Sequence, residues 1–344
     1  MTQKTNKYAV FTPYSVILYS IFKGMNKEKI LITGAFGQLG TALTEALVYR
    51  YGADAIIATD LNIKEGMLCK TLKLDVTDIS RLNEVVRINS VTQIYHLAAI
   101  LSAKGEERPL QTWELNNQTF FNVLEVARNH NIEKVFFPSS IAVFGPDARK
   151  RDVPQDFPLH PKTVYGISKV AGENWSSYYN DKYNLDVRCL RYPGLISYQS
   201  LPGGGTTDYA VDVFHKAIKA EKFICYLTED TQLPMLYMDD AIKATLQLME
   251  APKSQVKKGE AYNLQGISFS PKMIVEEIQK YLPDFKAEYV PDYRQIIAEG
   301  WPISLDDTSA IKDWGWAPEF DLKKMTAEML QHLQHKYENQ KIHA

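Results

Sequence analysis

From Lys29 onward, short apolar runs alternate with longer amphipathic stretches along the chain. The short runs are typical of buried strands, whereas the longer stretches repeat apolar residues at helical spacing, as Leu39, Leu43 and Leu47 do. Strands joined by helices in this way run parallel, because each helix returns the chain to the same edge of the sheet. The pattern therefore predicts an α/β fold of the Rossmann type, with a doubly wound parallel sheet.

The alternation also suggests how the chain is divided. The predicted strands of its first part are residues 29–33, 55–59, 71–74, 93–97, 135–138 and 187–191, and the predicted helices are 38–50, 79–88, 110–129 and 163–183. After Tyr192 the rhythm changes to helices 208–220, 239–249 and 270–281, with short strands at 223–227 and 262–264. We expect a dinucleotide-binding domain over 25–192. We expect a smaller mixed α/β substrate domain over 193–344, with a segment near 234–265 returning to the first domain.

Residues 1–24 differ from the rest, because they carry three lysines and neither an acidic residue nor an arginine. Their apolar stretch is interrupted by Thr12, Pro13 and Ser15, and it is too short to span a membrane. We interpret them as an extension outside the fold and expect a cytoplasmic protein. A mitochondrial matrix location is the alternative if this segment is a transit peptide.

Composition excludes several classes of function. The net charge of −2 lacks the basic excess of a nucleic-acid binder, and no later stretch is apolar enough for a membrane span. The three cysteines form no CxxC pair, and His332 and His335 have no third ligand nearby, so no metal site is predicted.

The first candidate site is the turn Gly34-Ala-Phe-Gly37-Gln-Leu-Gly40, which follows a predicted strand and opens a predicted helix. Glycines there allow backbone N–H groups to approach a pyrophosphate at the helix N-terminus, although such a turn alone is equally compatible with a structural role. Asp60 ends the next strand, where a carboxylate binds the adenosine ribose and repels a 2′-phosphate, so NAD is favoured over NADP. Asp75 and Val76 end the third strand, at the edge where an adenine can lie.

The second candidate site is the pair Tyr165 and Lys169, which share one helix face at i and i+4. A YxxxK pair by itself is usually structural. Here it follows the fifth predicted strand, which ends at Ser139 and Ser140. A neighbouring ammonium favours a phenolate, so Tyr165 is a candidate base for removing a carbinol proton while Ser140 orients the substrate oxygen.

Together with His96-Leu97-Ala98-Ala99 and Asn116, these motifs resemble the extended short-chain dehydrogenase/reductase superfamily, which includes NAD-dependent epimerases and dehydratases. The resemblance implies an NAD-dependent enzyme whose catalytic residues are Tyr165, Lys169 and Ser140. It implies that the cofactor-binding residues are Gly34, Gly37, Gln38, Leu39, Gly40, Asp60, Leu61, Asp75, Val76, Leu97, Ala98, Ala99, Asn116, Ser139, Tyr165, Lys169, Tyr192 and Leu195.

The C-terminal half is similar in more detail to the short-chain-type L-threonine 3-dehydrogenase family. The similarity rests on residues 101–106, 191–194, 202–210, 233–241 and 313–316. It implies oxidation of L-threonine at C3 to L-2-amino-3-oxobutanoate, with substrate contacts from Ser102, Ser140, Tyr165, Thr206, Thr207, Asp208 and Trp301. Residue 140 is Ser where some members have Thr, and the hydroxyl is retained. A flexible connector is the alternative for 202–208, and a packed core aromatic is the alternative for Trp301.

Two other functions are compatible with the same scaffold. A nucleotide-sugar epimerase or dehydratase is the main alternative, although it needs a larger pocket and Phe144 replaces the tyrosine usual in sugar epimerases. An NAD-binding regulator without turnover has no need for the Ser140, Tyr165 and Lys169 set. The resemblance also implies a homodimer that packs through the helices predicted at 110–129 and 163–183.

Overall fold

The structure is a computed structural model, and it describes residues 28–257 and 259–342. The predictions for residues 1–24 lie outside the described residues. Within the described ranges, no helix combines the length and the apolar character needed to cross a bilayer.

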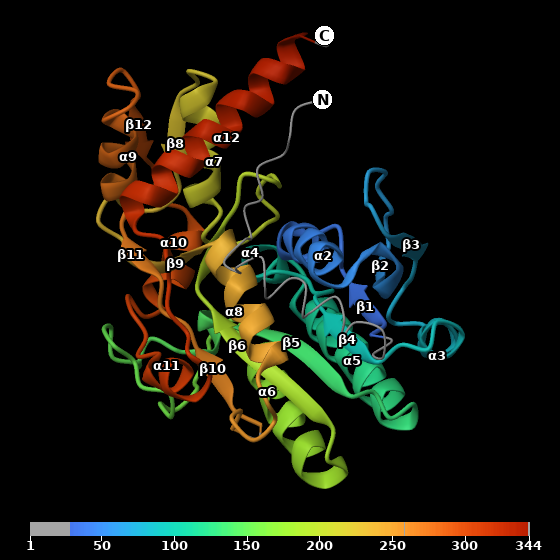
Figure 1. Ribbon diagram of the computed structural model, residues 1–344. Helices are drawn as coiled ribbons and strands as arrows, with labels where there is room; N and C mark the ends of the chain where they lie inside the picture. Colours follow the sequence, from blue (N-terminus) through green and yellow to red (C-terminus); the bar gives the residue numbers. More distant parts are fainter. Residues whose placement is uncertain (1–27, 258, 343–344) are drawn as a thin grey trace.

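The centre of the molecule is a seven-stranded sheet in which every neighbouring pair of strands is parallel (Figure 1). Its order is β10-β6-β5-β4-β1-β2-β3. The strands are β1 (Ile30–Thr33), β2 (Ile56–Asp60), β3 (Lys70–Lys73), β4 (Gln93–His96), β5 (Lys134–Ser140), β6 (Asp186–Tyr192) and β10 (Ala261–Asn263). The chain proceeds in one direction from β1 to β3 and in the other from β4 to β6, so the order reverses between β1 and β4. Ligands of such sheets bind at this reversal, beyond the carboxyl ends of the strands.

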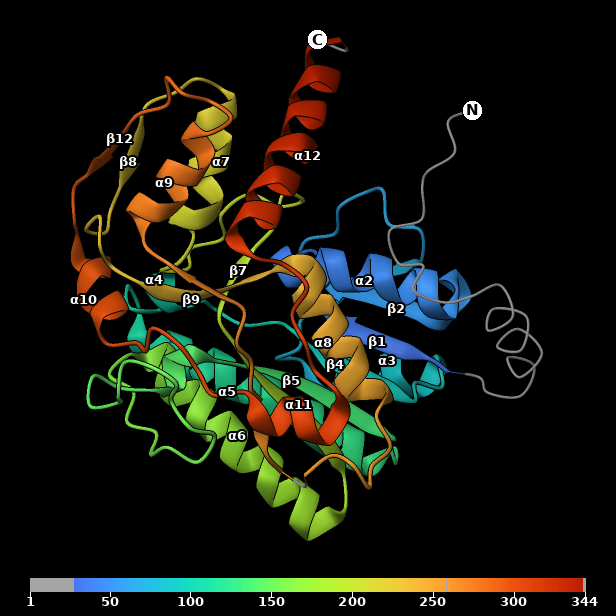
Figure 2. The ribbon, with the colours of Figure 1, turned by 60° about the vertical axis from the view of Figure 1, so that its left-hand side comes forward.

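Helices cover both faces of this sheet (Figure 2). Side chains of β1 alternate between the faces. Ile30 and Ile32 join the core beneath α2 (Gln38–Tyr51) and α8 (Met238–Glu250), and Leu31 joins the core beneath α3 (Ile79–Ile88) and α5 (Pro109–Asn129). Both faces of β1 are therefore covered, which explains why this central strand is buried along its length, whereas the edge strand β3 exposes Lys70 and Lys73. The helices are α2 (Gln38–Tyr51), α3 (Ile79–Ile88), α4 (Ser102–Gly105), α5 (Pro109–Asn129), α6 (Val164–Tyr183), α7 (Tyr209–Ile218), α8 (Met238–Glu250), α9 (Pro271–Gln279), α10 (Tyr293–Glu299), α11 (Thr308–Trp314) and α12 (Leu322–Ile342).

A third core lies outside the large sheet, where α7, α9 and α12 gather with β8 (Phe223–Cys225) and β12 (Ala287–Tyr289) (Figure 1). The strands β8 and β12 pair in parallel. A separate three-stranded sheet joins β7 (Gly194–Ile196), β9 (Leu233–Tyr237) and β11 (Ile267–Phe269). From β9 the chain returns through α8, which packs on α2, to β10 at the edge of the large sheet.

The predicted Rossmann-type α/β fold is confirmed, and the predicted helices of the first part agree with the structure to within a few residues. The sequence analysis did not identify β9, which has five residues, or β7, β11 and β12, which have three residues each. It also missed the short helices α4, α10 and α11. The division into domains at residues 192 and 193 stays a prediction.

Candidate active site

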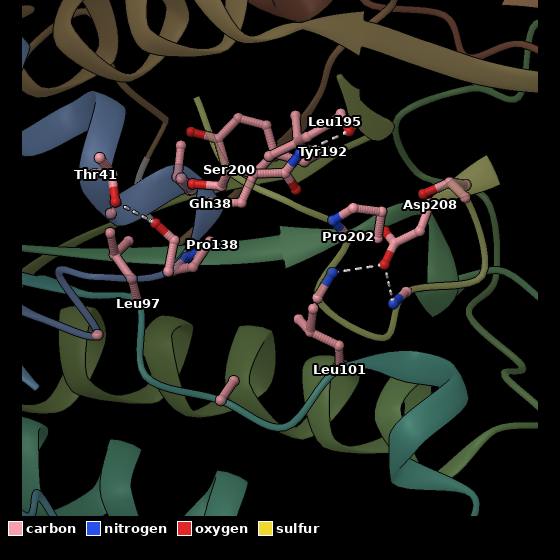
Figure 3. A pocket seen from close by; sticks show the side chains of 18 of the residues that line it. Gln38, Thr41, Leu97, Leu101, Pro138, Tyr192, Leu195, Ser200, Pro202 and Asp208 are labelled. Atoms are coloured by element: carbon pink, nitrogen blue, oxygen red, sulfur yellow. Dashed lines mark hydrogen bonds between the residues drawn. The ribbon is translucent and has the colours of Figure 1, made fainter. Parts of the chain in front are cut away.

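A cavity of about 930 Å³ opens at the carboxyl edge of the large sheet. One part is bordered by the glycine turn after β1 and by the loop before β3. The other part is bordered by α4, by the loop after β7 and by Trp301. Figure 3 shows Gln38 of α2, Leu97 after β4, Tyr192 of β6 and Asp208 before α7 around this cavity. The cavity thus lies at the reversal of strand order, where an α/β sheet places its ligand.

The glycines of the turn are required by its geometry. Gly34 has a φ of +71°, and a Cβ added there would lie 2.7 Å from the backbone nitrogen of Ala98. A Cβ on Gly40 would lie 2.2 Å from the carbonyl oxygen of Gly34. The turn therefore packs directly on its neighbours, and α2 begins at the cavity with backbone N–H groups near its lining.

Asp60, the last residue of β2, lies beside the glycine turn and binds its backbone. Its Oδ2 accepts a hydrogen bond of 3.1 Å from the N–H of Phe36, while Lys64 Nζ donates one of 3.3 Å to the carbonyl oxygen of Phe36. A carboxylate and an ammonium therefore bind the two polar groups of one residue of the turn. Lys64 lines the cavity, and Asp60 is not among the lining residues.

Tyr165, Lys169 and Ser140 meet at the end of the cavity that lies over β5. The Ser140 hydroxyl is the hydrogen-bond partner of the Tyr165 phenol. Burial raises the pKa of Tyr165 to about 12, and this hydrogen bond to Ser140 opposes the rise. The sequence analysis expected the Lys169 ammonium to favour the phenolate, whereas burial raises the pKa of this phenol. The ammonium lies 5.4 Å from the centre of the Tyr165 ring.

Lys169 is buried, with 4% of its surface exposed, and its Nζ donates a hydrogen bond of 2.6 Å to the carbonyl oxygen of Pro138. Burial lowers its pKa to about 8. His96, at the end of β4, is also buried, and burial together with the charge of Lys169 lowers its pKa to about 3. A neutral imidazole there bonds the Thr33 hydroxyl through Nδ1 at 2.9 Å.

In the other part of the cavity, Asp208 organises the glycine-rich loop. Its Oδ2 accepts hydrogen bonds from the backbone N–H groups of Gly203, Gly204 and Gly205 at 2.8, 2.8 and 2.9 Å, two of which Figure 3 shows as dashed lines. Burial raises the pKa of Asp208, and these bonds oppose the rise. The second oxygen, Oδ1, is the one with capacity left for a ligand.

The loop is also attached to α4. The hydroxyls of Ser102 and Thr206 lie 3.1 Å apart, and the N–H of Thr206 donates to Ser102 Oγ at 3.2 Å. Tyr226 binds the loop from below, since its hydroxyl donates to the carbonyl oxygen of Thr206 and accepts from the N–H of Tyr209. The loop is therefore attached to α4 and to Tyr226 and forms one wall of the cavity.

Most of the predicted site residues line the cavity. They are Gly34, Gly37, Gln38, Leu39, Gly40, Leu97, Ala99, Ser102, Ser139, Ser140, Tyr165, Lys169, Tyr192, Leu195, Thr207, Asp208 and Trp301. Trp301 is 6% exposed, so it is buried like an aromatic residue of the core. It also forms part of the cavity wall.

Other predicted site residues are not among the lining residues: Asp60, Leu61, Asp75, Val76, Ala98, Asn116 and Thr206. Asn116 braces the loop after β4, because its side-chain amide bonds both the N–H and the carbonyl oxygen of Ile100. Asp75 Oδ1 accepts from the N–H and the hydroxyl of Thr77. Their roles toward a cofactor stay predictions.

The sequence analysis did not identify Lys64, Lys104, Gln199 and Lys336 as lining residues. Lys336 lies on α12, near the end of the chain, and no motif marks it. Lys64 follows Asp60 by four residues, and a search for cations just beyond the acidic strand end would have found it. Among the described residues, no group of three or more His, Cys, Asp or Glu side chains is placed to hold a metal ion.

A sequence profile of the NAD dependent epimerase/dehydratase family matches residues 30–264, which is more than half of the chain. The chain belongs to this family. Its Rossmann sheet, its glycine turn and the Tyr165–Lys169 pair all fall within the matched residues.

Relatives of the chain within this family carry more specific names. The mitochondrial L-threonine 3-dehydrogenase of Bos taurus is 41% identical over 313 residues, which cover 90% of this chain and 83% of that protein. The solved structure of the GalE-like L-threonine dehydrogenase from Cupriavidus necator, in its holo form, is 49% identical with a TM-score of 0.87, covering 89% of this chain and 99% of that one. A structure described as a monomeric L-threonine 3-dehydrogenase from a metagenome is also 49% identical, with a TM-score of 0.87 and the same coverage.

As expected of an NAD-dependent family, the described residues suit a dinucleotide. Gly34 and Gly40 have no room for a side chain, so neither residue carries one that would block a pyrophosphate from the N-terminus of α2. The cavity then continues without a break to Ser140, Tyr165 and Lys169, where a nicotinamide would have to lie for hydride transfer.

Proposed function

We propose that this protein oxidises L-threonine at C3 with NAD, giving L-2-amino-3-oxobutanoate and NADH. The observation that carries the proposal is the single cavity that joins the glycine turn, the Ser140–Tyr165–Lys169 set and the loop held by Asp208. The names of the bovine relative and of the two solved structures, at 41–49% identity, support the choice of substrate.

In the proposed mechanism, Tyr165 removes the proton of the threonine hydroxyl. Ser140, already the hydrogen-bond partner of Tyr165, donates to the same substrate oxygen and orients it. NAD supplies the hydride acceptor when it is bound, and its nicotinamide carries a positive charge. Since burial raises the pKa of Tyr165 to about 12, the phenolate needs positive charge nearby, and the Lys169 ammonium provides it from this chain.

The substrate is a zwitterion, and the second part of the cavity offers groups of both polarities. We propose that Asp208 Oδ1 pairs with the substrate ammonium. Ser102 and Thr207, which line the cavity on the same side, are the proposed donors to its carboxylate. Trp301 closes the wall behind the methyl group and excludes water.

The direct test is to mix the purified protein with NAD and L-threonine and to follow NADH by its absorbance. Turnover with threonine, and none with D-threonine under the same conditions, is the expected result. No NADH from threonine, together with turnover of a nucleotide sugar, would contradict the proposal.

The second candidate is a nucleotide-sugar epimerase or dehydratase. Such an enzyme binds a second diphosphate, for which arginine is the favoured partner. The lining residues in the described part of the chain include Lys104 and Lys336 but no arginine, and a lysine also binds phosphate, so the choice of the smaller substrate rests on the names of the relatives.

We also propose a homodimer that forms through α5 and α6. Their outer faces expose the aromatic side chains of Trp113, Trp175 and Tyr178, with 39%, 39% and 46% of their surface accessible. Sedimentation equilibrium tests the assembly, and Trp175→Glu is expected to give monomers. The relative described as monomeric makes a single subunit the alternative outcome.

For the cellular location we propose the cytoplasm, with the mitochondrial matrix as the alternative because the bovine relative is named as mitochondrial. Fractionation of cells that express the full chain, with and without residues 1–24, distinguishes the two.

A further inference from the structure

A buried ion pair lies directly behind the proposed catalytic residues. Glu173 and Arg191 have side chains that are each 7% exposed, and Arg191 Nε and Nη2 donate to the two carboxylate oxygens of Glu173 at 3.0 and 2.9 Å. Neither residue lines the cavity. The pair is therefore not a substrate contact, and its position needs another explanation.

The pair connects the two elements that carry the catalytic side chains. Glu173 follows Tyr165 and Lys169 on α6 at intervals of four residues, so all three share one side of the helix. Arg191 of β6 lies opposite Ser139 of β5 in the strand register, and Ser140 is the next residue. The ion pair thus lies between the helix of Tyr165 and Lys169 and the strand end of Ser140.

Ser139 completes the connection, because its hydroxyl donates a hydrogen bond of 2.5 Å to Glu173 Oε1. The hydroxyl of Ser139 is therefore engaged inside the protein, although the residue borders the cavity. Arg191 is held from the other side, since its Nη1 donates to the carbonyl oxygen of Gln155 and to Asn263 Oδ1. A carboxylate fixed in this way cannot move without moving the end of β5.

We propose that Glu173, held by Arg191, is a positioning residue of the active site, which fixes Ser140 relative to Tyr165 and Lys169 by binding Ser139 from their own helix. This inference rests on the proposed dehydrogenase function. A displacement of about 1 Å in such an arrangement costs on the order of a hundredfold in rate, so a fixed link between strand and helix has a measurable effect.

The same carboxylate acts on the charge of Lys169. The groups around Lys169 are Tyr165 on α6, the Phe137 ring and Pro138 carbonyl of β5, His96 of β4 and Cys189 of β6. Burial lowers the pKa of Lys169, and the interactions with Cys189 and Glu173 raise it. Burial raises the pKa of Cys189 to about 12, so this residue is a neutral thiol near pH 8, and Glu173 is then the group that supplies negative charge.

The test compares Ser139→Ala and Glu173→Gln with a matched control, Asp186→Asn. Asp186 and Arg188 form a second buried ion pair on β6, at the other end of the strand, with distances of 2.9 and 2.8 Å. Asp186→Asn is expected to lower stability and to keep the wild-type kcat and pH profile. Ser139→Ala keeps the ion pair and is expected to lower kcat about tenfold, with the KM values within about twofold.

Glu173→Gln is expected to lower kcat about a hundredfold and to shift the alkaline loss of activity to lower pH. In cofactor-free protein labelled with ¹³C-lysine, Lys169, assigned through Lys169→Arg, is expected to titrate at lower pH than in the wild type. If Glu173→Gln does not fold, the double variant Glu173→Gln/Arg191→Met, which removes both charges, takes its place.

Wild-type kcat in Ser139→Ala, or a Lys169 titration that Glu173→Gln and its double variant leave unchanged, would overturn the proposal and leave the ion pair a purely stabilising role. The lysine titration requires neither threonine nor NAD. A wild-type protein that does not oxidise threonine would therefore overturn the proposed function and still give a result for Glu173.

Discussion

Lys169 Nζ donates a hydrogen bond of 2.6 Å to the carbonyl oxygen of Pro138 and so ties α6 to the end of β5. Ser139 and Ser140, which follow Pro138, are therefore held close to Lys169, which lies one helical turn beyond Tyr165. Because strand and helix are joined at this point, the fold itself fixes the arrangement of the three proposed catalytic side chains. Preorganisation of this kind avoids the cost of ordering the groups during the reaction.

Replacing Tyr165 by phenylalanine tests the proposed base. We expect kcat to fall at least about a thousandfold, because phenylalanine lacks the phenol oxygen that accepts the proton in the proposed mechanism. The dissociation constant for NAD, measured by calorimetry, should change by no more than a few fold, since the ring is kept. Turnover at the wild-type rate would remove Tyr165 from this role.

The preference for NAD is expected to depend on Asp60. Asp60→Ala should lower the ratio of kcat/KM for NAD over NADP about tenfold or more, because a carboxylate that repels a 2′-phosphate is lost. Asp60→Asn separates charge from structure, since an amide oxygen can still accept the bond from the N–H of Phe36.

Lys64 provides the matched control for this experiment. It lines the cavity and binds the carbonyl oxygen of Phe36, so it is placed to attract a phosphate once Asp60 is neutral. Asp60→Asn/Lys64→Met should therefore accept NADP less well than Asp60→Asn. An NAD/NADP ratio that stays at the wild-type value in all of these variants would contradict the role of Asp60.

The first part of the fold could be predicted because its signals are local and long. The apolar runs and the four long helices each repeat over enough residues to show their period. Strands β7, β9, β11 and β12 were missed because each exists by pairing with a distant partner, as Gly194 of β7 does with Met235 of β9. Their formation depends on tertiary contacts, which a single sequence does not display.

The same distinction applies to the site. The spacing of Gly34, Tyr165 and Lys169 within their motifs predicts their arrangement, so these residues could be identified without a structure. Lys336 reaches the cavity from α12, and Glu173 reaches Ser139 across 34 residues of chain. Asp208 was predicted as a substrate contact, but its bonds to three backbone N–H groups follow from the folded shape of the loop.

Two substitutions of Asp208 separate the support of the loop from the recognition of the ammonium. Asp208→Asn keeps an oxygen for the N–H groups of Gly203 to Gly205 and loses the charge, whereas Asp208→Ala loses both. We expect both to raise the KM for threonine, by about tenfold for Asn and more for Ala, with the KM for NAD unchanged. A wild-type KM in Asp208→Asn would limit Asp208 to supporting the loop.

Stability is expected to fall in mild acid because of two buried histidines. His96 and His215 are 2% and 3% exposed, and burial, helped by nearby lysines, lowers their pKa values to about 3 and about 4. An unfolded histidine binds a proton below about pH 6.5, where the folded protein keeps both rings neutral. The unfolded state then binds more protons, so the free energy of unfolding decreases as the pH falls from about 6.5 toward the folded pKa values.

Each histidine should contribute a loss of about 2 kcal/mol between pH 6.5 and pH 5, since one pKa unit corresponds to about 1.4 kcal/mol. Urea unfolding at these two pH values measures the loss. His96→Asn, which can still bond the Thr33 hydroxyl, should be less stable at pH 6.5 and lose about 2 kcal/mol less on acidification. His130→Asn is the control, because His130 is a partly exposed residue that bonds Asn83 on the surface, and it should keep the full wild-type loss. An equal loss in His96→Asn and the wild type would show that His96 is already protonated in the folded protein.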